Sequence, residues 1–229
     1  MRAIFTYLLV FLSCISFSQS LDRIDSLVKT LDTIQDDQRV INTHLMICGA
    51  IMRYDTTRFL NHLSIAEGLS IKECDQLQCK NSRLRFYSEM GFSKKAEQLL
   101  EELGKGNFDE CPILLAQVKI SEGNHYDITG KYDKALEAYL VAEKVYRENG
   151  DDRGVGITQM GIGNIYSLTG RLPEAVRYFK KSWLGLKESS PVYASWSLNN
   201  MATAYNGLGL LDSALYFFEE SLKTKLEQN

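Results

Sequence analysis

Three histidines and one glycine-rich segment are the features of this 229-residue chain that first suggest chemistry. His44, His62 and His125 are of the residue type that often ligates zinc or transfers protons, but their spacing matches no metal motif. The segment GVGITQMGIG, at 154–163, is glycine-rich like a phosphate-binding loop, but no strand pattern precedes it. No G-x-S-x-G, P-loop or H-E-x-x-H motif occurs. The sequence therefore predicts a protein that is not an enzyme and that holds no cofactor or metal.

The composition favours an all-helical protein. Only 3 residues are proline, Leu, Ala, Glu and Lys are abundant, and no segment has the alternating Val/Ile pattern of a strand. The formal net charge is −3, with no block of basic residues. Because nucleic-acid binding needs a Lys- and Arg-rich face, no nucleic-acid partner is expected.

The first residues have the pattern of a secretory signal. Arg2 precedes an apolar run of about 15 residues, which is shorter than the roughly 20 residues of a membrane span. Ser16 and Ser18 then occupy the positions that signal peptidase requires before Gln19. We therefore expect a cleaved signal at 1–18 and an exported, periplasmic or secreted chain. Two alternatives remain open: an uncleaved membrane anchor, or lipidation of Cys14.

The rest of the chain is organised by a repeat. An amphipathic helix is expected within 19–39, and five helical hairpins follow at 40–73, 77–110, 116–149, 156–189 and 195–228, together the array 40–229. One position early in each second helix recurs at spacings of 37 to 40 residues. It is alanine at Ala96, Ala135, Ala175 and Ala214, and Phe59 occupies it in the degenerate first copy. Five residues before the alanines stand Gly91, Gly130, Gly170 and Gly209, where a positive φ would reverse the chain.

The alternation of small and aromatic residues has a packing reason. Two antiparallel helices approach closely only where one presents a very small side chain, and an aromatic ring one turn away fills the remaining space. Gly123 and Gly163 are such small residues, and Tyr139 and Phe179 are such rings. The pattern resembles the tetratricopeptide repeat across essentially the whole chain after the signal. The resemblance implies an all-α, right-handed superhelical solenoid of about five hairpins plus an N-terminal helix.

Four cysteines remain after the expected signal, an even number for an oxidising compartment. Cys74 and Cys111 occupy equivalent turns between repeats, and Cys79 lies close to the first in sequence and to the second across the hairpin. A disulfide from Cys79 to Cys74 or Cys111 is predicted, without a choice between them. The alternative is that all four, including Cys48, are free thiols.

The resemblance also implies a peptide-binding groove along the first helices of the hairpins. Its lining would be Gln117, Ile120, Asn124, Asp127, Ile157, Met160, Asn164, Ser167, Trp196, Asn199, Thr203 and Asn206, with Asn200 beside them. Asparagine both donates and accepts hydrogen bonds, so it is suited to a peptide backbone, and the apolar members would add contact area. The Lys and Arg residues of chaperone-binding relatives are missing here, so an acidic C-terminus is not expected as ligand. The alternative is that these asparagines only hydrate the surface.

Two functional hypotheses follow. The first is an exported, non-catalytic scaffold that binds a protein or an extended peptide. The second is the sensory region of a membrane-bound histidine kinase or DNA-binding regulator that would continue beyond the repeats. A structural alternative is self-association through the last hairpin, because Leu208, Leu211, Leu215 and Phe218 are expected to be partly uncovered there.

Overall fold

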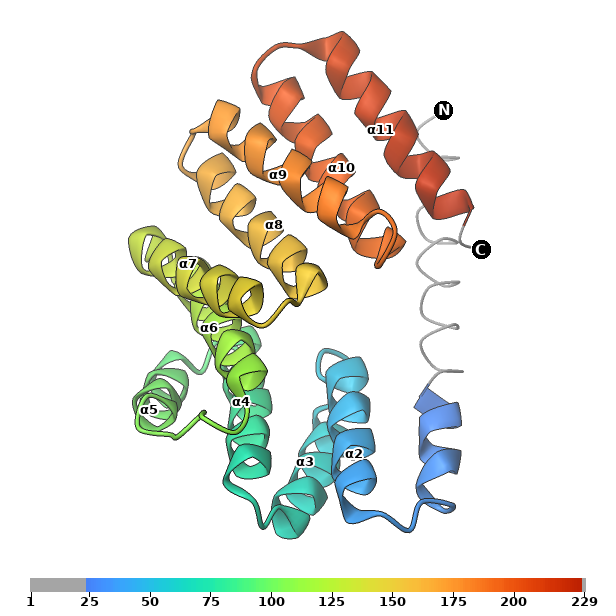
Figure 1. Cartoon of the computed structure of the whole chain (residues 1–229), viewed down its shortest axis with the longest axis vertical. Coiled ribbons are helices and arrows are strands. Elements are labelled where there is room, and N and C mark those ends of the chain that lie inside the picture. Colours follow the sequence, from blue (N-terminus) through green and yellow to red (C-terminus); the bar gives the residue numbers. More distant parts are fainter. Residues whose placement is uncertain (1–23, 228–229) are drawn as a thin grey trace. The chain divides into compact units, whose positions relative to one another are not determined.

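The computed structural model describes residues 24–227, and every regular element in that range is a helix. After helical residues 24–31, the order is α2 (Asp37–Ile51), α3 (Thr56–Leu69), α4 (Glu73–Glu89), α5 (Ser93–Leu103), α6 (Pro112–Ile128), α7 (Tyr132–Glu148), α8 (Asp152–Leu168), α9 (Leu172–Leu186), α10 (Pro191–Gly207) and α11 (Leu211–Leu226) (Figure 1). The predicted all-α repeat solenoid is confirmed. The expected signal at 1–18, with Cys14, lies outside the described residues. Within 24–227 no helix combines the length and apolar character that a membrane span requires.

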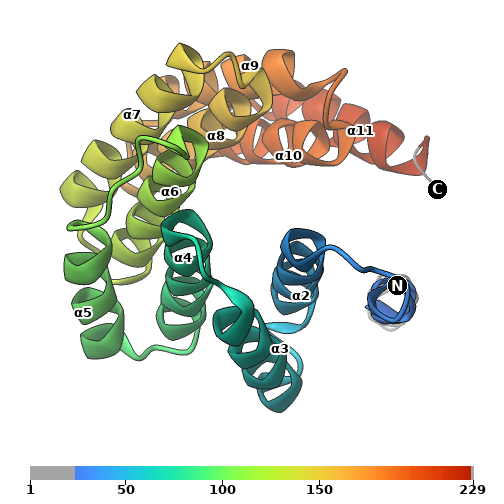
Figure 2. The ribbon, with the colours of Figure 1, turned by 60° about the horizontal axis from the view of Figure 1, so that its bottom comes forward.

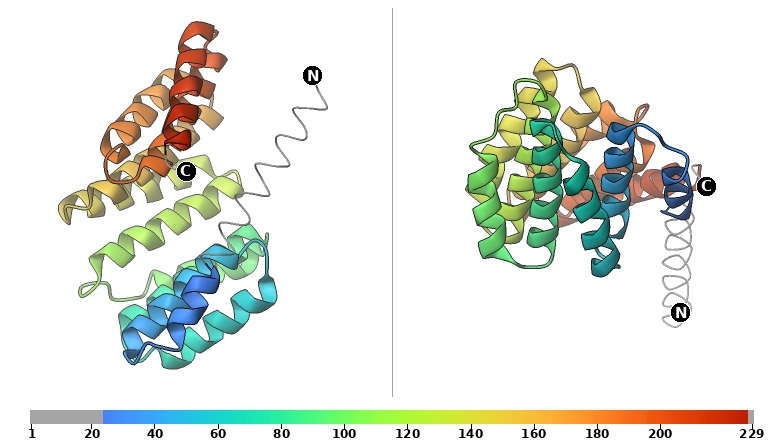
Figure 3. Two further views of the ribbon diagram at one scale, coloured as in Figure 1. Left: turned by 90° about the vertical axis from the view of Figure 1, so that its right-hand side faces the viewer. Right: turned by 90° about the horizontal axis from the view of Figure 1, so that it is seen from below.

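The chain divides into two compact units, the first ending at Phe86 and the second beginning at Tyr87. In the second unit α6 packs on α7, α8 on α9 and α10 on α11, while α7–α8 and α9–α10 contacts join successive hairpins. Figure 2 shows α6, α8 and α10 in one layer of this unit and α7 and α9 in the other. Figure 3 shows these hairpins following one another in chain order. The first helices of three successive hairpins therefore form one continuous surface.

The turn glycines have the backbone conformation that their positions predict. Gly91, Gly130, Gly170 and Gly209 have φ of 75°, 71°, 76° and 76°. At the second of these turns, the N–H of Lys131 donates to the carbonyl of Tyr126 at 2.8 Å, and the other three turns have the equivalent bond. This pattern is a Schellman motif, which ends a helix and turns the chain into the next. The spacing of glycines in the sequence thus sets where each hairpin reverses.

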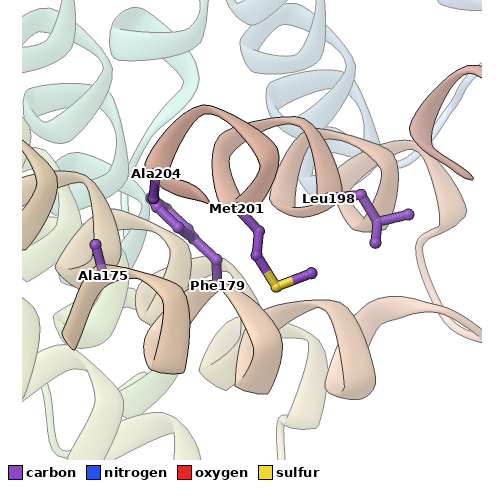
Figure 4. Packing of buried hydrophobic residues seen from close by; sticks show 5 residues of the cluster. All are labelled: Ala175, Phe179, Leu198, Met201 and Ala204. Carbon is purple, nitrogen blue, oxygen red and sulfur yellow. The ribbon is translucent and has the colours of Figure 1, made fainter. Parts of the chain in front are cut away.

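Small side chains and aromatic rings interlock between the helices of the second unit. The Cα of Gly163 lies so close to Phe179 that a Cβ there would be 2.6 Å from ring atom Cε1, and a Cβ on Gly123 would be 2.7 Å from Cε1 of Tyr139. Ala175 is fully buried in one cluster with Phe179, Leu198, Met201 and Ala204 (Figure 4). The packing predicted from the repeat pattern is therefore present in both hairpins.

The first unit replaces the repeat alanine with a larger residue. Phe59 is 1% exposed, and its ring stacks on that of Phe86 with centroids 4.6 Å apart. Arg83 and Glu67 form a forked ion pair, with the closest contact, Nη2 to Oε2, at 2.6 Å. This hairpin keeps the helical architecture with different interior packing.

Two histidines that the sequence separates meet in this first unit. The Nδ1 atoms of His44 and His62 are 2.8 Å apart, so one ring donates and the other must accept with a neutral nitrogen. Burial lowers the pKa of His44, and the facing His62 lowers it further. Burial also lowers the pKa of His62, followed by the nearby charge of Arg58. The pair therefore resists protonation while the protein is folded.

We expect the free energy of unfolding to decrease as the pH falls below about 6.5, the ordinary pKa of histidine. The folded pKa values are lowered, so the unfolded chain binds more protons in that range and acid favours unfolding. Urea denaturation at about pH 7.5 and about pH 5.5 measures the effect. His62→Gln keeps a polar partner for His44 but does not titrate, so this variant should lose less stability on acidification. A wild-type protein equally stable at both pH values would contradict the account.

Candidate functional site

The residues predicted to line the groove lie on the first helices of three hairpins, as their positions require. Gln117, Ile120, Asn124 and Asp127 are on α6, Ile157, Met160 and Asn164 on α8, and Trp196, Asn199 and Asn200 on α10. None is fully buried, and Gln117, Asn124 and Trp196 are exposed. The contacts of these side chains with one another decide which of them are available to a ligand.

A hollow of about 240 Å³ joins part of this set. Its lining comes from four helices and consists of Asp127, Asn164, Ser167, Leu168, Phe179, Asn200 and Thr203. Ser167 and Thr203 were also predicted to line the groove. Leu168 was not predicted, although its position four residues after Asn164 places it on the same face of α8. Phe179 was predicted only as a core ring, but it also lines the hollow. The structure thus gathers Asp127, Asn164 and Asn200 around one depression.

The two asparagines of the hollow are joined to each other. Nδ2 of Asn200 donates to Oδ1 of Asn164 at 3.0 Å. A carboxamide has one oxygen and one NH₂ group, so whichever way the two amides are oriented, one oxygen and one NH₂ remain free of this bond. A peptide backbone presents the matching pair, a carbonyl and an N–H. The pair can therefore hold a backbone while each amide fixes the orientation of the other.

Asn124 accepts a hydrogen bond within the fold, a role that its position in the sequence did not predict. The hydroxyl of Tyr139 donates to Oδ1 of Asn124 at 2.6 Å, and the tyrosine is 3% exposed. A buried hydroxyl that loses its acceptor is costly. Asn124 thus supports the packing of α7 on α6, and its NH₂ group is free of this bond.

Asp127 is the charged residue of the hollow. Its side chain is half-buried, and burial raises the pKa of its carboxyl group. Among residues 24–227, no side chain or backbone group donates a hydrogen bond to this carboxylate, and no cation pairs with it. The charge of Asp127 also contributes to raising the pKa of Tyr139, after the larger effect of burial. The hollow therefore contains a partly dehydrated carboxylate without a counter-charge.

The apolar residues of the predicted groove differ in availability. Trp196 is 44% exposed, and its ring meets Tyr193 edge-on with centroids 4.8 Å apart. Met160 packs against the cluster of Ala175 and Phe179, and Ile120 packs against two core clusters. Trp196 is thus the large apolar side chain of the set that is open to a partner.

The predicted disulfide of Cys79 with Cys74 or Cys111 is wrong. Cys79 is a free thiol, 1% exposed, and its sulfur lies 3.4 Å from the hydroxyl of Ser70. Cys74 and Cys111 are each disulfide-bonded, and Cys48 is free. The physical reason is helical geometry. Cys79 lies five residues after Cys74, so it is on a different face of α4, the one that packs into the core. Burial raises the pKa of Cys48 to about 12 and also raises that of Cys79, so both are unreactive in the folded chain.

Two other hollows of the second unit, of about 330 and 320 Å³, share Glu122, Tyr126 and Lys134. Sequence reasoning did not single them out. Two ion pairs lie in their walls, Lys131 with Glu97 at 2.7 Å and Lys119 with Glu122 at 2.7 Å, and the further carboxylates Glu101 and Glu137 are on exposed residues. Within residues 24–227 no group of His, Cys, Asp and Glu side chains is arranged to hold a metal ion. The hollow at Asp127 is thus distinguished by an unpaired carboxylate that is half-buried rather than exposed.

Comparison with known proteins gives one match to a family model and several to solved structures. Residues 195–226 match the family model of the tetratricopeptide repeat. No curated protein matches the chain.

Several solved structures share the fold at low sequence identity. BtubC from P. vanneervenii is 12% identical with a TM-score of 0.68, and the match covers 93% of this chain and 90% of that one. A signal transduction ATPase with a tetratricopeptide repeat sensor, from Pyrococcus horikoshii, is 17% identical with a TM-score of 0.69, covering 81% of this chain and 29% of that one. A Rap protein complexed with competence and sporulation factor is 14% identical with a TM-score of 0.68, covering 90% and 59%. These likenesses show a common fold.

Proposed function

We propose that this chain, whose fold is that of tetratricopeptide-repeat proteins, is a non-catalytic module that binds an extended segment of another protein along α6, α8 and α10. The observation that carries the proposal is the hollow lined from all three helices, with a linked pair of amides at Asn164 and Asn200. An extended peptide satisfies its backbone by hydrogen bonds and gains specificity from side-chain pockets. The Rap protein of the same fold, seen in complex with competence and sporulation factor, is consistent with a binding role.

The exposed Trp196 supplies the apolar part of this surface. It lies four residues before Asn200 on α10, so both side chains are on one face of the helix. Tryptophan is enriched among residues that dominate binding energy because it buries a large area with little loss of conformational freedom. A bound segment would thus meet amides at the hollow and an indole ring beside it.

The test is selection from a displayed library of random peptides of about twelve residues, followed by affinity measurement on variants. Asn164→Ala, Asn199→Ala and Trp196→Ala should each weaken the selected peptides by about 1–3 kcal/mol. Asn124→Ala is unsuitable, because it would also remove the acceptor of Tyr139.

Matched controls lie on the second helices of their hairpins. Asn61→Ala on α3 and Tyr216→Ala on α11 change exposed side chains of similar type, so the selected peptides should bind both variants as they bind the wild type. Equal binding to all variants would move the site off this surface. A library that yields no binding peptide would contradict the proposed function.

Export remains part of this proposal. The disulfide-bonded state of Cys74 and Cys111 supports it, since disulfides persist mainly in oxidising compartments. The check is N-terminal sequencing of the protein recovered from its native host. A mature chain beginning at Gln19 is expected, and recovery of an unprocessed chain from a reducing compartment would contradict export.

A further inference from the structure

We propose that the hollow beside Asp127 holds the cationic side chain of the bound segment, a lysine or an arginine. This inference rests on the proposed function and adds the chemistry of the ligand. The carboxylate of Asp127 has no partner among the described residues, and no lysine or arginine is part of the described lining of the hollow. A lone negative charge in a partly dry depression attracts a positive group that also donates hydrogen bonds.

The surrounding polar groups favour a donor-rich ligand. The hydroxyl of Thr203 already donates to the carbonyl of Asn199 at 3.0 Å, so towards the hollow this oxygen can only accept. The hydroxyl oxygen of Ser167 can also accept, and the linked amides leave one oxygen free. An ammonium group has three donors and a guanidinium group has five, so either can meet the carboxylate and these oxygens together.

The size and the apolar walls agree with one long side chain. A volume of about 240 Å³ is below the roughly 300–1,000 Å³ of sites that enclose a whole small molecule. Leu168, which is 58% exposed, contributes apolar surface along which the carbon stem of a lysine or arginine can lie. A single carboxylate is too poor a ligand set for a metal ion, since calcium and magnesium require several oxygens at fixed geometry. An organic cation is therefore the chemistry that fits.

The test combines peptide selection with a double-mutant cycle. Displayed peptides are selected on the wild-type protein and, separately, on Asp127→Asn, which keeps the shape of the side chain and removes its charge. The wild type should enrich peptides with lysine or arginine at one fixed position, and Asp127→Asn should not. Asp133→Asn, at an exposed position of α7, is the matched control and should enrich the same peptides as the wild type.

The best synthetic peptide is then compared with its glutamine-substituted form on both proteins. We expect either single change to weaken binding about tenfold or more, and the two changes together to weaken it little further. The melting temperature of Asp127→Asn should be equal to or above that of the wild type, because a half-buried charge is removed.

The possible results distinguish this inference from the proposed function on which it rests. Peptides that bind, and that Trp196→Ala weakens, but that show no preference for lysine or arginine would overturn the inference and leave the proposed function standing. Additive effects in the cycle would overturn it as well, since the two groups would not meet. No binding peptide on the wild type would overturn both.

Discussion

Ala175→Leu is expected to lower the free energy of unfolding by about 1–3 kcal/mol, although the change adds apolar volume. Ala175 is fully buried and packs in a cluster with Phe179 and Met201 (Figure 4). The crossing of α9 with its neighbours leaves no room for three further carbon atoms, because interiors are packed to crystalline density. The backbone or the ring of Phe179 must then shift. Urea denaturation measures the loss, and Ala135→Leu, at the equivalent place in α7, should behave alike.

The matched control for overpacking is Lys180→Leu, an exposed position on the same helix. Exposed substitutions usually change stability by no more than about 0.5 kcal/mol. An Ala175→Leu variant as stable as this control would show that the helices do not cross at the alanine.

Gly163→Ala is expected to destabilise the fold by about 1 kcal/mol or more, despite the better helix propensity of alanine. The new Cβ would lie 2.6 Å and 2.7 Å from Cε1 and Cδ1 of Phe179, closer than real contacts allow. The ring is 1% exposed and is held by the cluster around Ala175, so it cannot withdraw without disturbing other contacts. The propensity gain of about 0.5–1 kcal/mol is therefore outweighed.

The same substitution at Gly185 should have the opposite sign. Gly185 lies in α9 of the same hairpin, and the nearest atom to an added Cβ is the Cα of Gly156 at 4.0 Å. Gly185→Ala therefore gains helix propensity without a clash, about 0.5–1 kcal/mol. Thermal or urea unfolding of the two variants beside the wild type checks both signs. A stabilising Gly163→Ala would contradict the interlocking of glycine and ring.

Much of the fold could be predicted from the sequence because each repeated residue type meets a local structural requirement. A glycine at fixed spacing marks a helix end that needs a positive φ, and Gly130 and Gly170 have one. An alanine at fixed spacing marks a close helix crossing, and Ala135 and Ala175 are fully buried. The glycines of 154–163, which imitate a phosphate loop, lie within α8, where Gly156 accommodates Leu186 of the neighbouring helix.

The last hairpin leaves several apolar side chains exposed, as the sequence predicted. Phe218 occupies the position of the repeat's aromatic ring in this hairpin and is 39% exposed. The neighbouring Phe217 stacks on Tyr205 instead, with centroids 5.4 Å apart. Leu211 and Leu215 are exposed, as the sequence analysis expected. Which aromatic ring packs against a neighbouring helix depends on the surface that the helix offers. The spacing of one residue type does not specify that surface.

The candidate site could be predicted as a set of positions but not as a set of contacts. Helical register places Asn164 and Asn200 on equivalent faces, whereas their hydrogen bond depends on the distance between two helices. The bond of Asn124 with Tyr139 depends in the same way on how α7 lies against α6. The unpaired state of Asp127 is a property of all its neighbours together, so no local pattern contains it.

The central claim is that ligand binds on the layer formed by α6, α8 and α10. The most direct measurement is NMR of the labelled protein titrated with a selected peptide, following backbone amides and the side-chain NH₂ groups of asparagine. The account predicts that the NH₂ signals of Asn164, Asn199 and Asn200 shift together with backbone signals of α6, α8 and α10. Shifts confined to α7, α9 or the exposed leucines of α11 would contradict it.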